Sequence, residues 1–321
     1  MLSRYLYKHA GALTRCSNLA KFNGVRSLSS TSNHSQNKNT NALTDSSNLI
    51  LTLAEIRRAC NLKTGSNGTV VIGNQSSGKT SFVEAMIGTD SIFEKHSGAA
   101  TKRPTRINVY NVNEDVPWVK FGSFGEKIYD MEVVRRRLFE LNSGDFSAIP
   151  IEITFGTSKV PDMLITDYPG FISTTKAGEN DDLPTIIEDM CRPAIEDDTA
   201  FKIVVMNGTV DRAGSIALRE VKKAGQFSNT LGVLARCDLI ADSSHGRRKL
   251  VEDLENTDYL PGLGMVGIVL RSSTQLENGI TIPQQLIVEE EFITKHNLHP
   301  HDEPTIRMGV PVIREIVSRR Q

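Results

Sequence analysis

The chain has 321 residues, of which 39% are hydrophobic and 23% are charged, and its formal net charge is −1. These values are typical of a globular protein that can bury a sizeable core. No apolar run approaches the roughly 20 residues that a membrane-spanning helix needs, so we expect any membrane contact to be peripheral. No basic stripe interleaved with aromatic side chains follows residue 38, which argues against a nucleic-acid partner.

The first 44 residues have the composition of a targeting segment. They contain no acidic side chain but carry six cations, Arg4, Lys8, Arg15, Lys21, Arg26 and Lys38. Bulky apolar residues between the first cations are typical of an amphipathic import helix, and Arg26-Ser27-Leu28-Ser29 resembles a mitochondrial processing site. We therefore predict a mitochondrial presequence over residues 1–28 and a mature protein in the matrix or at the inner membrane. The alternative is a disordered basic tail on a cytosolic protein.

The rest of the chain divides into three parts. Residues 29–44 are rich in Ser, Asn and Thr and are predicted to be a disordered linker, and an apolar stripe predicts a helix over residues 45–62. Beyond these, short apolar runs predict strands at Thr69–Ile72, Ile107–Val112, Ile151–Phe155, Met163–Thr166, Lys202–Met206, Thr230–Leu234 and Met265–Val269. Helical patterns stand between them at Thr80–Ile87, Ile186–Ile195, Ser215–Ala224 and Gln284–Lys295. The alternation predicts a doubly wound, mostly parallel α/β sheet flanked by helices over residues 63–321.

A phosphate-binding loop is predicted at Gly73–Thr80, which reads Gly-Asn-Gln-Ser-Ser-Gly-Lys-Thr between the first strand and a helix. Its glycines would let backbone N–H groups wrap the phosphates at a helix N-terminus, where the helix dipole favours anions. Lys79 would neutralise the β- and γ-phosphates, and the Thr80 hydroxyl would ligate Mg²⁺. The pattern predicts a site for a nucleoside triphosphate.

Three further strand ends carry residues that suit the same ligand. Asp167-Tyr168-Pro169-Gly170 follows one strand, where Asp167 could hold Mg²⁺ through water and the Gly170 backbone could reach the γ-phosphate. Asp238 follows another strand, and a carboxylate there can accept two hydrogen bonds from guanine that adenine cannot donate. Leu270-Arg271-Ser272 could line the base and ribose. The nucleotide predicted from these elements is GTP, with ATP as the alternative.

Taken together, these motifs resemble those of the dynamin superfamily of large GTPases. The resemblance covers about residues 45–321, and it includes Ser97–Pro104 as the first switch and Arg307–Pro311 as the close of the GTPase domain. It places the helix over 45–62 as the first helix of a small bundle. The presequence and the segment Gly208–Ser215 are similar to the mitochondrial branch, which remodels inner membranes. The nucleotide-binding residues that it implies are Gly73, Asn74, Gln75, Ser76, Ser77, Gly78, Lys79, Thr80, Ser81, Arg236, Asp238, Leu270, Arg271 and Ser272.

The resemblance also implies a mechanism of hydrolysis. The implied catalytic residues are Gln75, Ser76, Lys79, Thr101 and Gly170, and the implied Mg²⁺ residues are Thr80, Thr101 and Asp167. Ser76 and the Gly98 backbone would hold a monovalent cation, K⁺ or Na⁺. Two GTPase domains would pair across the nucleotide, with Asp211 reaching the partner's site. The implied partners are therefore GTP and GDP, and a second copy or a full-length dynamin-like protein.

The chain departs from the family pattern at several positions, and these departures leave a second function open. Ala235-Arg236-Cys237-Asp238 replaces Thr-Lys-x-Asp, Leu270 replaces Asn and His96 replaces Gly, and the sequence ends at Gln321, where the resemblance would lead one to expect a helical stalk next. The alternative to an active GTPase is thus a hydrolysis-poor GTP-binding module, or a truncated regulator of a full-length partner.

We interpret Glu289-Glu290-Glu291 as a solvated helix face, and the histidines at 296, 299 and 301 as part of a polar loop rather than a metal site.

Overall fold

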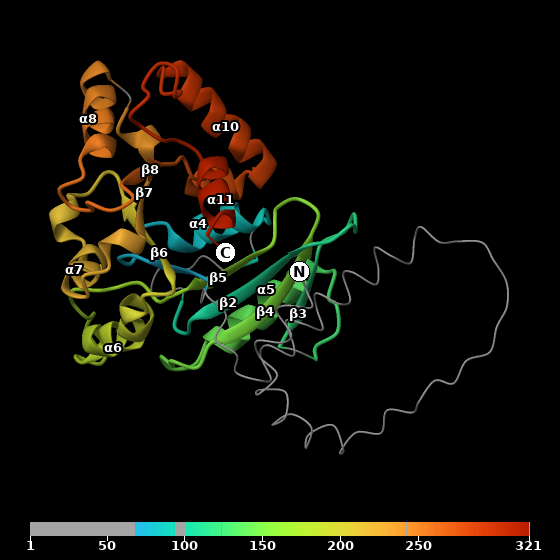
Figure 1. The fold of residues 1–321 in the computed structure, drawn as a ribbon. Coiled ribbons are helices and arrows are strands. Elements are labelled where there is room, and N and C mark those ends of the chain that lie inside the picture. Colours follow the sequence, from blue (N-terminus) through green and yellow to red (C-terminus); the bar gives the residue numbers. More distant parts are fainter. Residues whose placement is uncertain (1–67, 91, 94–100, 123, 242, 321) are drawn as a thin grey trace, which may run out of the picture. The chain divides into compact units, whose positions relative to one another are not determined.

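A computed structural model of the chain describes residues 68–90, 92–93, 101–122, 124–241 and 243–320 (Figure 1). The predicted presequence, linker and helix over 45–62 lie outside the described residues, as do His96 and Gly98.

One mixed sheet of eight strands organises the described part of the chain. Its order is β3-β4-β2-β5-β1-β6-β7-β8. Five of the neighbouring pairs are parallel, and the β2–β5 and β3–β4 pairs are antiparallel. The strands are β1 (Thr69–Ile72), β2 (Thr105–Asn111), β3 (Trp118–Phe121), β4 (Ile151–Thr157), β5 (Met163–Asp167), β6 (Phe201–Asn207), β7 (Thr230–Ala235) and β8 (Met265–Gly267). The predicted doubly wound α/β architecture is confirmed.

Helices cover both faces of this sheet (Figure 1). The α-helices are α4 (Lys79–Ile87), α5 (Met131–Asn142), α6 (Leu183–Glu196), α7 (Ile216–Lys223), α8 (Ser244–Glu255), α9 (Ser273–Glu277), α10 (Ile282–Lys295) and α11 (Val310–Ser318). Short 3₁₀ turns stand at η1 (Arg212–Gly214), η2 (Phe227–Asn229) and η3 (Cys237–Leu239). The four helices predicted from periodicity correspond to α4, α6, α7 and α10, whereas α5, α8, α9 and α11 were not predicted.

Two buried apolar clusters lie on opposite faces of the sheet, as alternation along a strand requires. In β1, Val71 belongs to the cluster that includes side chains of α4, α5 and α11, whereas Val70 and Ile72 belong to the cluster that includes α6, α7 and α8. Helix α10 contributes Ile282 to the first cluster and Ile293 to the second. Burial on both faces explains why β1 reads as an uninterrupted apolar run.

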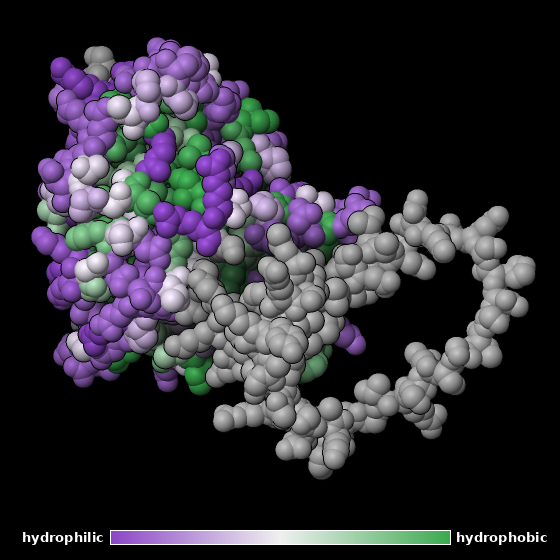
Figure 2. All heavy atoms as spheres, viewed as in Figure 1, coloured by the Kyte–Doolittle hydropathy of each residue, from purple (hydrophilic) through white to green (hydrophobic). Residues whose placement is uncertain are grey.

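The surface drawn in Figure 2 is predominantly hydrophilic, and hydrophobic side chains show in its upper half. Figure 1 places α10 in this part of the view, and its Ile287 is 59% exposed. Over the described residues, no helix combines the length and the hydropathy that crossing a bilayer requires.

Glu289 corrects the interpretation of the triplet Glu289–Glu291 as a solvated helix face. The other two residues of the triplet, Glu290 and Glu291, are exposed, but Glu289 is only 2% exposed. Its two carboxylate oxygens accept the backbone N–H groups of Val269 and Val310, each at 2.9 Å. Burial raises the pKa of this carboxyl to about 7, against the opposing effect of these two hydrogen bonds. Glu289 therefore joins the segment after β8 to the start of α11.

We predict that Glu289→Ala lowers the free energy of unfolding by about 2–4 kcal/mol, because it leaves two buried N–H donors without an acceptor. Urea denaturation at pH 7 measures this change. The matched control is Glu291→Ala, on the exposed side of the same helix, which we expect to stay within about 0.5 kcal/mol of the wild type. Equal effects of the two substitutions would contradict the role given to Glu289.

Candidate nucleotide-binding site

The carboxyl ends of the central strands meet at one edge of the sheet. Strands β5, β1, β6, β7 and β8 are parallel neighbours, so the segments that follow them lie side by side. Those segments carry the predicted motifs: the phosphate loop after β1, the Asp167–Gly170 motif at β5, the segment with Asp211 after β6, and Asp238 after β7. This edge is where open α/β sheets bind their ligands.

The phosphate loop has the backbone geometry that its sequence predicts. Gly78 is the N-cap of α4, with φ 94°, a left-handed conformation that glycine adopts without a steric penalty. Ser76 also has a positive φ, 61°. Lys79 is 6% exposed, and its Nζ donates to the Asn74 carbonyl oxygen at 3.0 Å. The lysine thus folds back over the loop, with its charge beside the helix N-terminus.

Backbone hydrogen bonds join this loop to the segment after β5. The N–H of Gln75 donates to the Phe171 carbonyl at 2.8 Å, and the N–H of Phe171 donates to the Gly73 carbonyl at 3.1 Å. Gly170 immediately precedes Phe171. A Cβ at Gly170 would stand 2.8 Å from the Gln75 Cα and 2.9 Å from the Lys79 Nζ. Only a glycine lets the two segments approach this closely.

Asp167 is the buried charge at the centre of the site. Its Oδ2 accepts the hydroxyls of Thr80, at 3.3 Å, and Thr101, at 3.5 Å. Its Oδ1 is buried and has no hydrogen-bond partner within the described residues. The structure therefore brings the three predicted Mg²⁺ residues together.

Burial shifts the pKa values of Asp167 and Lys79 in the directions that favour the uncharged side chains. It raises the pKa of Asp167 to about 6, although the Lys79 charge and the two threonine hydroxyls oppose this shift. It lowers the pKa of Lys79, although the Asp167 charge opposes that shift. A carboxylate and two hydroxyls are oxygen donors of the kind that Mg²⁺ prefers, and a buried carboxylate oxygen without a partner suits a cation or its water. The donor set therefore fits the predicted Mg²⁺.

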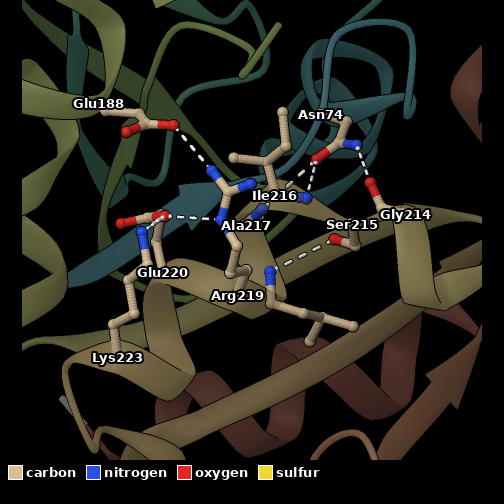
Figure 3. Close-up of polar contacts among 10 residues, drawn as sticks. Asn74, Glu188, Gly214, Ser215, Ile216, Ala217, Arg219, Glu220 and Lys223 are labelled. Carbon is tan, nitrogen blue, oxygen red and sulfur yellow. Dashed lines mark hydrogen bonds and ion pairs between the residues drawn. The ribbon is translucent and has the colours of Figure 1, made fainter. Parts of the chain in front are cut away.

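Asn74 has a second role, which the loop motif does not predict. Its side-chain oxygen accepts the N–H groups of Ile216, at 3.0 Å, and Ala217, at 3.4 Å, while its Nδ2 donates to the Gly214 carbonyl at 3.1 Å (Figure 3). These bonds tie the phosphate loop to the start of α7. A cavity of about 200 Å³ lies between the loop and residues 205–215.

Asp211, the predicted contact to a second copy, lies on this tethered segment and is exposed. Its Oδ1 accepts the Ala213 N–H at 2.9 Å, which leaves the carboxylate at the surface. The next residue, Arg212, pairs with Asp253 of α8 through a salt bridge and donates to the Asp253 carbonyl at 2.6 Å. The segment is thus held on one side by Asn74 and on the other by Arg212.

The predicted base-reading residues follow β7. Arg236 is exposed and has a left-handed backbone conformation, with φ 62°. The half-buried Asp238 lies in η3. Cys237 is buried between them, and its N–H donates to the Ile268 carbonyl at 3.2 Å. Burial raises the pKa of the Cys237 thiol well above its ordinary value, so this cysteine is an inert spacer rather than a reactive thiolate.

The side chains of Arg271 and Ser272 are engaged within the protein. The Arg271 guanidinium is 3% exposed and pairs with Glu84 of α4, at 3.3 Å, and with Asp90, at 3.0 Å. Ser272 is the N-cap of α9 and forms a capping box with Gln275. Leu270 is buried, and its Cδ1 would lie 3.2 Å from a Cβ at Gly78. This predicted segment therefore packs against the phosphate-loop helix.

Comparison with known proteins gives one family and several relatives. The model described as the dynamin family matches residues 69–237. The chain is 32% identical to the mitochondrial dynamin-like GTPase MGM1 of Saccharomyces cerevisiae over 249 residues, which are 71% of this chain and 27% of that protein. It is 28% identical to dynamin of Drosophila melanogaster and 26% identical to dynamin-1 of Homo sapiens, each over 257 residues and 78% of this chain. The chain spans less than a third of the length of these relatives.

We predict that Gly170→Ala weakens binding of a fluorescent GTP analogue at least about 10-fold, because the added methyl group displaces the phosphate loop or Lys79. Fluorescence anisotropy measures the affinity. Gly144→Ala is the matched control, because a Cβ there meets nothing within 4 Å. Wild-type affinity in the Gly170 variant would show that the close approach does not shape the site.

Proposed function

The chain belongs to the dynamin family, and from this premise we propose that it binds GTP with Mg²⁺ and hydrolyses it to GDP and phosphate. One observation supports this proposal above the others: the buried Asp167 receives the hydroxyls of Thr80 and Thr101 from two separate segments, directly beside Lys79. Such a cluster suits the metal and the triphosphate together.

Each residue of the cluster has a defined task in this proposal. Thr80 and Thr101 would hold Mg²⁺ directly, and Asp167 would hold it through water. The metal, when bound, neutralises the charge that develops on the phosphate oxygens. Lys79 reaches the β- and γ-phosphates, and the backbone N–H of Gly170 faces the γ-phosphate. Gln75 and Thr101 orient the attacking water.

We also propose that a second copy of the domain activates hydrolysis. Asp211 is exposed on a segment that Asn74 and Arg212 hold beside the phosphate loop, so an approaching domain would meet it in a defined position. Ser76, which has a left-handed backbone conformation, would help hold K⁺ or Na⁺ beside the nucleotide. Turnover should therefore rise with protein concentration and with a monovalent cation.

A second candidate function is a GTP-binding module with little hydrolysis. The observation that favours it is at the base side, where Arg236 is exposed and left-handed and the Arg271 side chain is engaged with Glu84 and Asp90. In this case the chain would regulate a full-length dynamin-like partner. Normal GTP affinity without turnover, even at high protein concentration, would select this function.

We further propose that the protein works in mitochondria, at the matrix side or peripherally at the inner membrane, in the organisation of that membrane. The acid-free, cation-rich residues 1–28 support this location. The similarity to a relative named as a mitochondrial dynamin-like GTPase supports it independently.

We predict that Lys79→Ala lowers GTP turnover at least about 100-fold, because it removes the cation that faces the transferred phosphate. Phosphate release from the full chain is measured with GTP and with ATP, at low and high protein concentration, in K⁺ and in choline. Lys222→Ala, an exposed substitution on α7, is the control and should behave as the wild type. Equal use of ATP and GTP would contradict the nucleotide assignment, and unchanged turnover in the Lys79 variant would contradict the site.

We also predict that residues 1–44 direct a fused fluorescent protein into mitochondria, where it becomes resistant to added protease. Replacing the cations at positions 4, 8, 15, 21 and 26 with Gln should leave the fusion in the cytosol, because import depends on positive charge. A cytosolic wild-type fusion would exclude the proposed location without affecting the GTPase proposal.

A further inference from the structure

Helix α5 holds the backbone that immediately follows Thr101. The helix ends at Asn142, whose side-chain oxygen accepts two consecutive backbone N–H groups, those of Lys102 at 2.9 Å and Arg103 at 3.2 Å. A carboxamide oxygen has two lone pairs, so one side chain can accept both bonds. Thr101 is therefore one residue away from a fixed point on α5.

The side chains of Lys102 and Arg103 reinforce this attachment. Lys102 Nζ donates to the Gly144 carbonyl at 3.1 Å, and the Arg103 guanidinium donates to the carbonyls of Leu141, at 3.3 Å, and Ile149, at 3.0 Å. Two cations thus meet carbonyl groups at and beyond the C-terminus of α5, where the helix dipole favours positive charge.

Backbone hydrogen bonds also hold residues 102–104 to the segment that leads into β4. The Ser147 N–H donates to the Lys102 carbonyl at 3.2 Å, and the Ile151 N–H donates to the Pro104 carbonyl at 2.8 Å, just before β2 pairs with β4. Helix α5 itself is fixed to the sheet through the buried Val134 and Leu138. The segment 102–104 is consequently held between a packed helix and a strand.

Asn142 is therefore the residue of α5 that holds the backbone next to Thr101. The Thr101 hydroxyl lies 3.5 Å from Asp167 Oδ2, at the long limit of a hydrogen bond, so a small backbone shift at residue 102 would remove it from the cluster. Thr80, by contrast, is attached to α4 and does not depend on α5. Loss of the Asn142 contacts should therefore disturb Thr101 and leave the phosphate loop in place.

We propose that Asn142 is a positioning residue for hydrolysis: it holds Thr101 in the place from which that residue orients the attacking water and contacts Mg²⁺. This inference rests on the proposed function of the same site. A purely structural role of Asn142, in ending α5, is the opposing account.

The test uses the full chain with Asn142→Ala and Asn142→Asp. The alanine variant loses the acceptor for both N–H groups, whereas the aspartate variant keeps it. We expect Asn142→Ala to lower kcat about 10- to 100-fold, since small displacements in a positioned site have effects of this size. The affinity for a fluorescent GTP analogue should stay within about 3-fold of the wild type, and Asn142→Asp should recover most of the lost kcat.

The control is Asn229→Ala, which removes amide hydrogen bonds to the carbonyls of Asp198 and Ala200, before the amino end of β6 and far from the carboxyl-end edge. Its kcat should equal that of the wild type even if its melting temperature falls.

Three results would each overturn the inference: unchanged kcat in Asn142→Ala, a parallel loss of kcat and affinity in that variant, or an aspartate variant as slow as the alanine variant. If Asn142→Ala does not fold, Asn142→Ser, whose hydroxyl is too short for both N–H groups, takes its place under the same criteria. A wild type without turnover would instead refute the proposed function.

Discussion

The arrangement of the site depends on the backbone pairing between the phosphate loop and the segment after β5. The pairing of Gln75 and Gly73 with Phe171 extends the parallel β1–β5 contact beyond the strand ends, and Gly170 permits the close approach. This pairing keeps the buried Asp167 next to Lys79 and Thr80, where each charge opposes the cost of burying the other. The remaining parts of the site are attached to this pair of segments.

Each attachment brings a distant part of the chain to the phosphate loop. Asn74 holds the start of α7 and with it the segment that carries Asp211. Glu84, one turn into α4, pairs with Arg271 and also accepts the Phe93 N–H at 3.2 Å. The phosphate-loop helix is thus joined to the base side of the site and to the backbone at Phe93.

Sequence patterns predicted the central strands and the phosphate loop because these depend on local rules: buried parallel strands are apolar throughout, and a glycine-rich turn must open α4. They did not predict the edge strand β3, whose burial does not alternate, since Trp118 and Val119 are both buried and the next two residues are half-buried, or the polar surface helix α8. They misassigned Glu289 to a solvated face and gave no role to Asn142. Both residues look like surface polar groups, and only tertiary contacts show that they accept pairs of backbone N–H groups.

The most direct test of the account is a crystal structure of the chain with a non-hydrolysable GTP analogue and Mn²⁺, in which anomalous scattering locates the metal. We predict one metal between the triphosphate and the hydroxyls of Thr80 and Thr101, at about 2.0–2.3 Å from each, with Asp167 one water away. We also predict Lys79 on the β- and γ-phosphates. A metal that contacts neither threonine, or a nucleotide bound away from residues 73–80, would contradict the account.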